Sequence, residues 1–293
     1  MHQSVMLEEA IKFLDLKPGD CVLDATTGAA GHAGEMIKAI MPGGKLIGLD
    51  ADISVLAEAE KKLADHKGSY KLFNINFRDA DKVLMEEGIN SIDGALFDLG
   101  VSSYQLDNES GGFSIKHNSR LDMRMDKRLK VTAYDIVNQY KEKELSDIIE
   151  KYGEERFHNR IARHIVAGRK ERPIETTFEL AEIVHKAIGY KNRKSRIDPA
   201  TRTFQAIRIA VNDELGSLEE ALKKIVSSLD LGARVCVISF HSLEDRIVKN
   251  LFKGYAGLGI LKIITKKPVQ PSHEEIVSNP RSRSAKLRVA ERM

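Results

Sequence analysis

The sequence predicts an α/β fold in which a mainly parallel open sheet is interrupted by a helical insert. Short apolar runs alternate with helix-length patterns up to about residue 110, helical patterns then dominate, and strand signals return after Gly232. A chain of 293 residues with 42% hydrophobic content can bury one large core or two smaller ones. We therefore expect a discontinuous core of residues 1–110 and 206–293 around an all-helical insert at 111–205.

The first half of the core follows a strand–helix–strand order. After an amphipathic N-terminal helix, four apolar runs are typical of buried strands, and the pattern at 53–66 is typical of a helix between two of them. This order predicts parallel pairing. The four expected strands lie at residues 21–25, 45–52, 69–74 and 94–100.

Helix signals in the insert come mainly from caps and glycines. From Gly111 to about Lys194 nearly every stretch has a helical pattern. Two pairs have the spacing of capping boxes, and two glycines are typical of helix ends. These are Thr132 with Asp135, Thr176 with Glu179, Gly153 and Gly168.

The second half of the core contains two helix starts and three strands. Asp198 followed by Pro199 predicts a helix N-cap and first turn, and Ser217 with Glu220 predicts the start of the next helix. Three later apolar runs are typical of strands. They occupy residues 234–240, 259–265 and 285–291.

Charge is distributed unevenly along the chain. Residues 1–110 contain 10 Lys/Arg against 19 Asp/Glu, whereas residues 151–210 contain 14 against 7. A basic block favours a polyanionic partner, because Lys and Arg displace counterions from phosphates. A solvated helical face is the alternative explanation.

The cysteines and the N-terminus predict a cytoplasmic protein. Cys21 and Cys236 both lie in apolar runs, which is typical of buried thiols in a reducing compartment. Two glutamates interrupt the N-terminal apolar pattern, and no apolar run approaches the length of a membrane span. We expect neither a signal peptide nor a membrane partner.

The glycine-rich stretch DATTGAAGHAGEM, residues 24–36, indicates the ligand class. A P-loop would place Lys-Ser/Thr after its last glycine, but His32 follows Gly31. The dinucleotide fingerprint needs G-x-G-x-x-G, whereas the glycines here are Gly28, Gly31 and Gly34. A nucleoside cofactor without pyrophosphate, such as S-adenosylmethionine, needs close backbone approach but no anion cradle.

Two aspartates at strand ends support a nucleoside ligand. Asp50 ends the second expected strand, where a carboxylate can accept hydrogen bonds from ribose hydroxyls, and Asp98 ends the fourth. Both belong to the carboxyl edge of the sheet, where open α/β folds bind ligands. The alternative for each is a plain turn aspartate. His32 could likewise simply cap a helix, and the nine histidines show no metal-ligand spacing, so no metal is expected.

Motifs along nearly the whole chain resemble one family. The chain is similar to the bacterial small-subunit ribosomal RNA methyltransferase H family. The motifs that carry the resemblance are DATTGAAGH, LDAD, FDLGVSSYQLD, GFSI, LDMRMD, YGEERF, RIDPATRTFQAIRIAVNDEL, SFHSLEDR and NPRSRSAKLRVAER. The resemblance implies a Rossmann-like class I methyltransferase fold and S-adenosyl-L-methionine as cofactor. It also implies methylation of N4 of a cytidine in the decoding region of 16S ribosomal RNA within the small subunit.

The resemblance also implies site residues. Ala30, Gly31 and His32 would line the methionine end of the cofactor, Asp50 would hold the ribose, and Phe77 would lie against the adenine, with Asp98 and Gln105 completing the pocket. The family loop usually reads Gly-Gly-His-Ser, whereas Ala30 and Ala33 stand here in its first and last places. Since alanine avoids positive φ, we expect Ala30 at negative φ.

Asp98 is the candidate for orienting the cytidine amine, alongside a backbone carbonyl of residues 99–101. The insert is expected to grip RNA backbone through a set of basic residues. These are Arg160, Arg163, Arg169, Lys170, Arg193, Lys194 and Arg196. LDMRMD would line the route to the active site or plug a domain interface.

Two rival functions differ in class. A nicotinamide-dependent dehydrogenase would share Asp50 but should show G-x-G-x-x-G. A noncatalytic RNA-binding assembly factor with a vestigial cofactor pocket would bind cofactor without turnover. The sequence leaves open whether the chain forms a homodimer.

Overall fold

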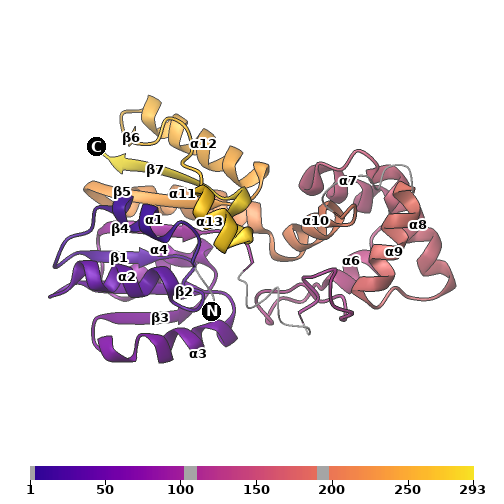
Figure 1. Cartoon of the computed structure of the whole chain (residues 1–293), viewed down its shortest axis with the longest axis horizontal. Coiled ribbons are helices and arrows are strands. Elements are labelled where there is room, and N and C mark those ends of the chain that lie inside the picture. Colours follow the sequence, from indigo (N-terminus) through magenta and orange to yellow (C-terminus); the bar gives the residue numbers. More distant parts are fainter. Residues whose placement is uncertain (1–3, 102–110, 190–197) are drawn as a thin grey trace. The chain divides into compact units, whose positions relative to one another are not determined.

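The computed structural model describes residues 4–101, 111–189 and 198–293, which fold as two compact units (Figure 1). One unit combines Met1–Gly100 with Leu215–Met293, and the other is Val101–Glu214. The first contains the sheet, and the described elements of the second are helices. The division falls at 214/215, so the helix that spans residue 206 belongs wholly to the helical unit.

A seven-stranded sheet has the order β3-β2-β1-β4-β5-β7-β6. Neighbouring pairs from β3 to β5 are parallel, whereas β7 runs antiparallel to both β5 and β6. All seven expected strands are confirmed. Their bounds are β1 Cys21–Asp24, β2 Lys45–Asp50, β3 Tyr70–Asn74, β4 Ile92–Asp98, β5 Leu229–Ser239, β6 Leu261–Ile263 and β7 Lys286–Arg292.

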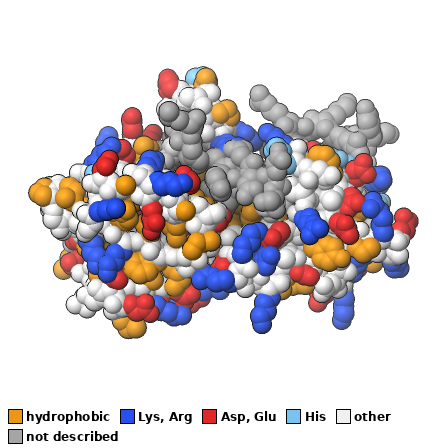
Figure 2. Space-filling model, turned by 90° about the horizontal axis from the view of Figure 1, so that it is seen from below, with side chains coloured by type: hydrophobic (Ala, Val, Ile, Leu, Met, Phe, Trp, Pro, Cys, Tyr) orange, Lys and Arg blue, Asp and Glu red, His pale blue; other side chains and the backbone are white. Residues whose placement is uncertain are grey.

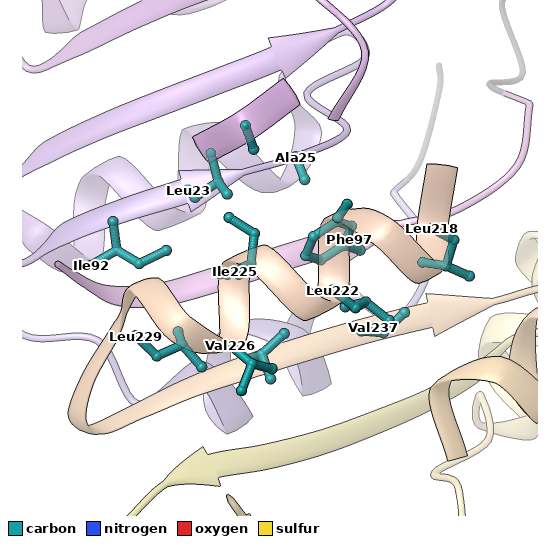
Figure 3. Close-up of a cluster of buried hydrophobic side chains, with 14 of the residues drawn as sticks. Leu23, Ala25, Ile92, Phe97, Leu218, Leu222, Ile225, Val226, Leu229 and Val237 are labelled. Carbon is teal, nitrogen blue, oxygen red and sulfur yellow. The ribbon is translucent and has the colours of Figure 1, made fainter. Parts of the chain in front are cut away.

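Helices cover both faces of this sheet. On one face α4 (Ala80–Glu86), α11 (Glu214–Ser228) and α12 (Ser242–Gly257) bury one apolar cluster. Leu218, Leu222 and Ile225 of α11 point toward Phe97 and Val237 of the central strands (Figure 3). The spacing of these leucines and isoleucine is that of one helix face, which explains why this segment is a helix and packs here.

The opposite face has its own apolar cluster. It is contributed by α1 (Leu7–Leu14), α2 (Gly31–Ile40) and α3 (Ile53–Lys62), together with the other sides of the strands. A short α13 (His273–Ser278) precedes β7. Because β1, β2 and β4 are parallel neighbours, their carboxyl ends and the loops that follow them meet at one edge.

The helical unit has a separate core. Its described helices are α6 Ala133–Gln139, α7 Glu142–Gly153, α8 His158–Glu171, α9 Thr177–Ile188 and α10 Thr201–Asn212, and their apolar faces form one cluster. The capping boxes at Thr132/Asp135 and Thr176/Glu179 are confirmed, and α7 ends at Gly153 as expected.

Three predicted helix boundaries are wrong. Helix α8 continues through Gly168 to Glu171, and Gly168 lies close to Ile183 of α9, where a side chain would be crowded. Ser217 lies inside α11, which begins three residues earlier. Helix α10 begins at Thr201 rather than directly after Asp198, although the Asp198 carboxylate still accepts a hydrogen bond from the Ala200 amide at 2.8 Å.

Residues 111–132 are irregular, whereas a helical pattern was expected from Gly111 onward. Gly112 has φ +72°, and a side chain there would collide with the carbonyl oxygen of Arg120. Met123 is also left-handed, at φ +58°. These two conformations are incompatible with a helix, and they fold the segment back on itself.

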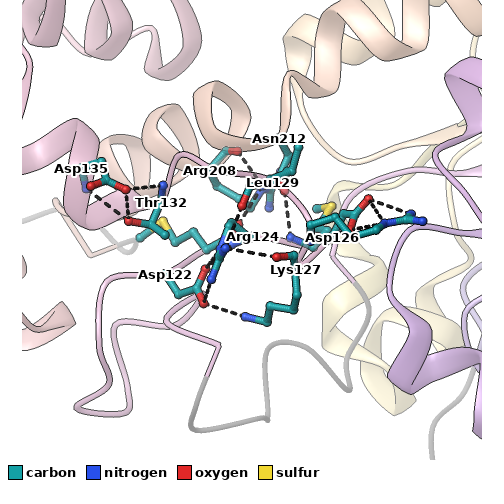
Figure 4. Close-up of polar contacts among 12 residues, drawn as sticks. Asp122, Arg124, Asp126, Lys127, Leu129, Thr132, Asp135, Arg208 and Asn212 are labelled. Atoms are coloured by element: carbon teal, nitrogen blue, oxygen red, sulfur yellow. Dashed lines mark hydrogen bonds and ion pairs between the residues drawn. The ribbon is translucent and has the colours of Figure 1, made fainter.

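Polar contacts hold this irregular segment within the helical unit (Figure 4). Asp122 accepts a hydrogen bond from Nε of Arg124 at 2.7 Å, and the same guanidinium donates to the carbonyl of Leu129 at 2.7 Å. Asn212, at the end of α10, donates to the carbonyl of Met123 at 2.8 Å. These hydrogen bonds stabilise the LDMRMD motif as a loop.

None of the helices in the described ranges has both the length and the apolar character that a bilayer crossing requires.

Candidate active site at the ends of three parallel strands

The glycine-rich loop joins β1 to α2 and contains two residues in the left-handed backbone region. Gly28 has φ +52° and Ala30 has φ +57°. The amide of Thr27 donates to the carbonyl of Leu49 at 2.8 Å, so the loop is fastened to the end of β2. The loop therefore lies directly over the carboxyl edge of the sheet.

Ala30 is a correction to the expectation of negative φ. It adopts the left-handed region and is fully buried, with its methyl group in the apolar cluster beneath α1 and α2. A left-handed alanine costs about 1–2 kcal/mol, and burial of the methyl group offsets part of that cost. Core packing thus accommodates alanine at position 30, where the loop of the similar family usually has glycine.

Asp50 holds the loop in place. Its two carboxylate oxygens accept hydrogen bonds from the amides of Gly28 and Asp52, each at 2.9 Å. Burial raises the pKa of Asp50 to about 6, and the charge of Asp52 adds to this, while the two amides pull the pKa down. Asp50 is thus a structural anchor at the place where the sequence predicts ribose contact.

Asp24 is an additional buried carboxyl that sequence reasoning did not select. It ends β1, is 1% exposed, and accepts one hydrogen bond from the amide of Thr26 at 3.1 Å. Its Oδ2 is buried with no hydrogen-bond partner among the described residues. Burial, followed by the charge of Asp50, raises the pKa of Asp24 to about 7.

Asp98 lies on the neighbouring strand end. Its amide donates to the hydroxyl of Thr26 at 2.6 Å, which ties β4 to the same loop. In the described part of the chain its Oδ1 is buried without a partner. Burial raises the pKa of Asp98 well above its usual value, as do the charges of Asp24, Glu244 and Glu275.

His32 joins this group from the first turn of α2. It is 5% exposed, with Nδ1 at 3.6 Å from Oδ2 of Asp98 and Nε2 at 3.0 Å from the carbonyl oxygen of Val5. Since a carbonyl can only accept, Nε2 carries hydrogen and donates. His32 therefore lies between Val5 and Asp98, and it does not cap α2.

Phe77 and Gln105 are the remaining expected site residues. Phe77 follows β3, begins a 3₁₀ turn (Phe77–Asp79), and packs edge-on against Phe97 with ring centroids 5.8 Å apart. It is half-buried, so part of the ring remains accessible near the edge of the sheet. Gln105 lies outside the described residues.

Glu244 and Glu275 complete the acidic surroundings of Asp98. Glu244 is buried and accepts from the amide of Phe240 at 2.9 Å, and Glu275 accepts from the amide of Met6 at 2.8 Å. The only sequence signal for them was their position three residues after a cap, His241 and Ser272. Among the described residues, Asp24 and Asp98 each have a buried oxygen without a hydrogen-bond partner, so this acidic edge is suited to a cationic ligand.

The basic residues that the sequence predicts to bind RNA differ in their surroundings. Arg169 donates to the carbonyls of Val137 and Tyr140 at 2.6 and 2.5 Å, so it caps the end of α6 and is not available to a ligand. Arg160, Arg163 and Lys170 are exposed on α8. Arg193, Lys194 and Arg196 lie outside the described residues.

Lys and Arg side chains are scattered among acidic and apolar ones over the face of the helical unit displayed at the right of Figure 2. Where that face is not drawn in grey, no single basic patch dominates.

Known proteins place this architecture in a family. The model of the MraW methylase family matches residues 1–293. The chain belongs to the MraW methylase family. This membership and the sheet order confirm the predicted Rossmann-like methyltransferase fold, and the chain is a methyltransferase.

Relatives in this family are similar over their whole length. Two proteins named Ribosomal RNA small subunit methyltransferase H illustrate this. The protein of Sulfurihydrogenibium sp. is 50% identical over 292 residues, and that of Clostridioides difficile is 47% identical over 307 residues. Each match covers 100% of this chain and 99% of the relative.

Proposed function

We propose that this MraW-family chain uses S-adenosyl-L-methionine to methylate N4 of a cytidine in the decoding region of 16S ribosomal RNA. The observation that carries the proposal is the group of carboxyls at the carboxyl edge of a methyltransferase sheet, of which Asp24 is buried and Asp50 and Asp98 are half-buried. The relatives' names support ribosomal RNA of the small subunit as the substrate. Such a substrate locates the activity in the cytoplasm.

The chemistry of these carboxyls fits the cofactor. S-adenosyl-L-methionine has a positive sulfonium and a positive ammonium group, and Asp24 and Asp98 each have a buried oxygen without a described partner. A cation is the ligand that such oxygens favour, because it stabilises the ionised form that burial disfavours. Asp50 would hold the ribose and Phe77 would lie against the adenine, with Ala30, Gly31, His32 and Gln105 around the rest.

The names of the relatives disfavour a noncatalytic assembly factor. Such a factor would bind cofactor without turnover and could have the same carboxyls, but the relatives are named as methyltransferases. The missing G-x-G-x-x-G pattern likewise disfavours a nicotinamide-dependent dehydrogenase.

Asp98 has two tasks in the proposed mechanism. When bound, the cofactor supplies an electrophilic methyl group. Asp98 accepts a hydrogen bond from the N4 amine, which leaves the nitrogen lone pair facing the methyl group. Such alignment lowers the barrier to methyl transfer. After transfer, N4 has one proton too many, and the Asp98 carboxylate accepts it. Nδ1 of His32 lies 3.6 Å from that carboxylate.

The helical unit supplies RNA contacts in this proposal. Arg160, Arg163 and Lys170 on α8 are exposed, and residues of this kind bind phosphates. The target cytidine must be unstacked from its neighbours for its amine to reach Asp98. A homodimer is not needed by this mechanism, since every described pocket residue comes from one unit of one chain.

Two measurements test this assignment. Nucleoside mass spectrometry of 16S ribosomal RNA identifies the product. Single-turnover methyl transfer by Asp98→Asn tests the acceptor: the rate should fall by about 10²-fold or more if Asp98 acts as general base, and an unchanged rate would remove Asp98 from the chemistry.

A further inference from the structure

The N-terminal residues Ser4–Met6 lie against the glycine-rich loop, far from it in sequence. Three contacts place them there. A Cβ added to Gly31 would collide with the side chain of Ser4, the carbonyl of Val5 accepts from Nε2 of His32 at 3.0 Å, and the amide of Met6 donates to Glu275 at 2.8 Å. This segment is thus fastened to α2 and to α13 at once.

Met6 shows that the segment is held in a defined conformation. It is fully buried and has φ +52°, a region that a long side chain rarely adopts. Such strain persists only where surrounding contacts over-determine the backbone, and it clusters at ligand sites. The contacts of Val5 and Met6 with His32 and Glu275 are what determine it.

We propose that Ser4–Met6 are positioning residues that hold Gly31 and His32 in the geometry the cofactor requires. The Val5 carbonyl fixes Nε2 of His32 as the donor, so Nδ1 is the atom turned toward Asp98. The close contact between Ser4 and Gly31 sets the distance between the N-terminal segment and the first turn of α2. The proposal rests on the proposed cofactor and adds a part of the chain to its site.

The Gly31–Ser4 contact allows a test by rescue. Gly31 is helical, so alanine there has no backbone strain, and its methyl group would meet Ser4 alone. Replacing Ser4 by glycine removes that obstacle and leaves only Cα, at 4.0 Å. We expect Gly31→Ala to weaken S-adenosyl-L-methionine binding by about 5- to 150-fold, the range of an overpacking clash. The double variant Gly31→Ala/Ser4→Gly should regain most of the affinity.

Gly34→Ala is the matched control. It makes the same change three residues later in α2, where an added Cβ approaches no closer than 4.0 Å to Leu63. It should bind the cofactor as wild type does, with isothermal titration calorimetry as the readout. If Gly31→Ala binds normally, or if Ser4→Gly fails to rescue it, the proposal is overturned, because the methyl group then meets nothing or meets the cofactor itself.

Hydrogen exchange on the unmodified protein gives a readout that needs no variant to fold. Saturating S-adenosyl-L-methionine should slow amide exchange in the peptide containing residues 4–10, together with the loop at 26–34. Slowing confined to the loop would overturn the proposal. A wild-type protein that does not bind S-adenosyl-L-methionine at all would instead contradict the proposed function.

Discussion

The amide of Gly28 donates a hydrogen bond to Oδ2 of Asp50 at 2.9 Å, joining the glycine-rich loop to the end of the adjacent strand. This single contact links the two sequence signals that predicted a nucleoside site. Asp50 thus acts on the shape of the loop before any ligand binds.

Removing the Asp50 carboxylate should damage the loop itself. In Asp50→Ala the amides of Gly28 and Asp52 lose their acceptor, and each unsatisfied amide costs about 1–3 kcal/mol. Asp50→Asn retains one acceptor oxygen and should lose less. Urea unfolding of the cofactor-free wild type and variants measures the loss, and an Asp50→Ala variant as stable as the wild type would show that neither hydrogen bond matters.

Asp24→Asn should stabilise the cofactor-free protein and weaken cofactor binding. The folded pKa of Asp24, about 7, lies above the usual value of 3.8, so this group makes the protein less stable as pH rises from about 4 to 7. Asparagine removes that penalty, for which about 4 kcal/mol is an upper limit.

The stability gain from Asp24→Asn should therefore be larger at pH 8 than at pH 5. Thermal unfolding at the two pH values tests this. A gain that is the same at both would mean that the ionisation of Asp24 is not what destabilises the wild type.

Cofactor binding should release protons near neutral pH. Asp24 and Asp50, with pKa values of about 7 and 6, are partly protonated in the empty protein, and a bound cation favours their ionised forms. Affinity should thus fall as pH decreases from 8 to 5.5. Calorimetry in buffers of different ionisation enthalpy counts the protons, and Asp24→Asn should release fewer.

Arg169 and Arg163 should separate stability from RNA binding. Arg169→Ala removes two charge-assisted hydrogen bonds to carbonyls at the end of α6, which should cost about 1.5–3 kcal/mol of stability. Arg163 lies on the exposed face of α8, the helix that also carries Arg169. Arg163→Ala should leave stability unchanged but weaken RNA binding and reduce its salt dependence. Identical effects of the two variants would contradict this division.

The sequence predicted the sheet and the loop well because their signals are local. Apolar runs ending in Asp50 and Asp98 predicted both strand ends, and capping boxes predicted the starts of α6 and α9. The left-handed φ of Ala30 could not be foreseen, since its methyl group is buried in a cluster to which α1 and several strands also contribute. The capping role of Arg169 depends likewise on a contact about 30 residues away along the chain.

The carboxyl group around Asp98 illustrates the same limit. The charges of Glu244 in α12 and Glu275 in α13 raise the pKa of Asp98. The N-terminal segment Ser4–Met6 contacts the glycine-rich loop and α13. No periodicity or spacing reports such contacts, because they arise only when the sheet brings strand ends together.

The most direct test of the account is nucleoside mass spectrometry of 16S ribosomal RNA after unmethylated small subunits are incubated with this protein and isotope-labelled S-adenosyl-L-methionine. We predict label in N4-methylcytidine at a single site in the decoding region. Cofactor binding seen by calorimetry without any labelled N4-methylcytidine would contradict the proposed function.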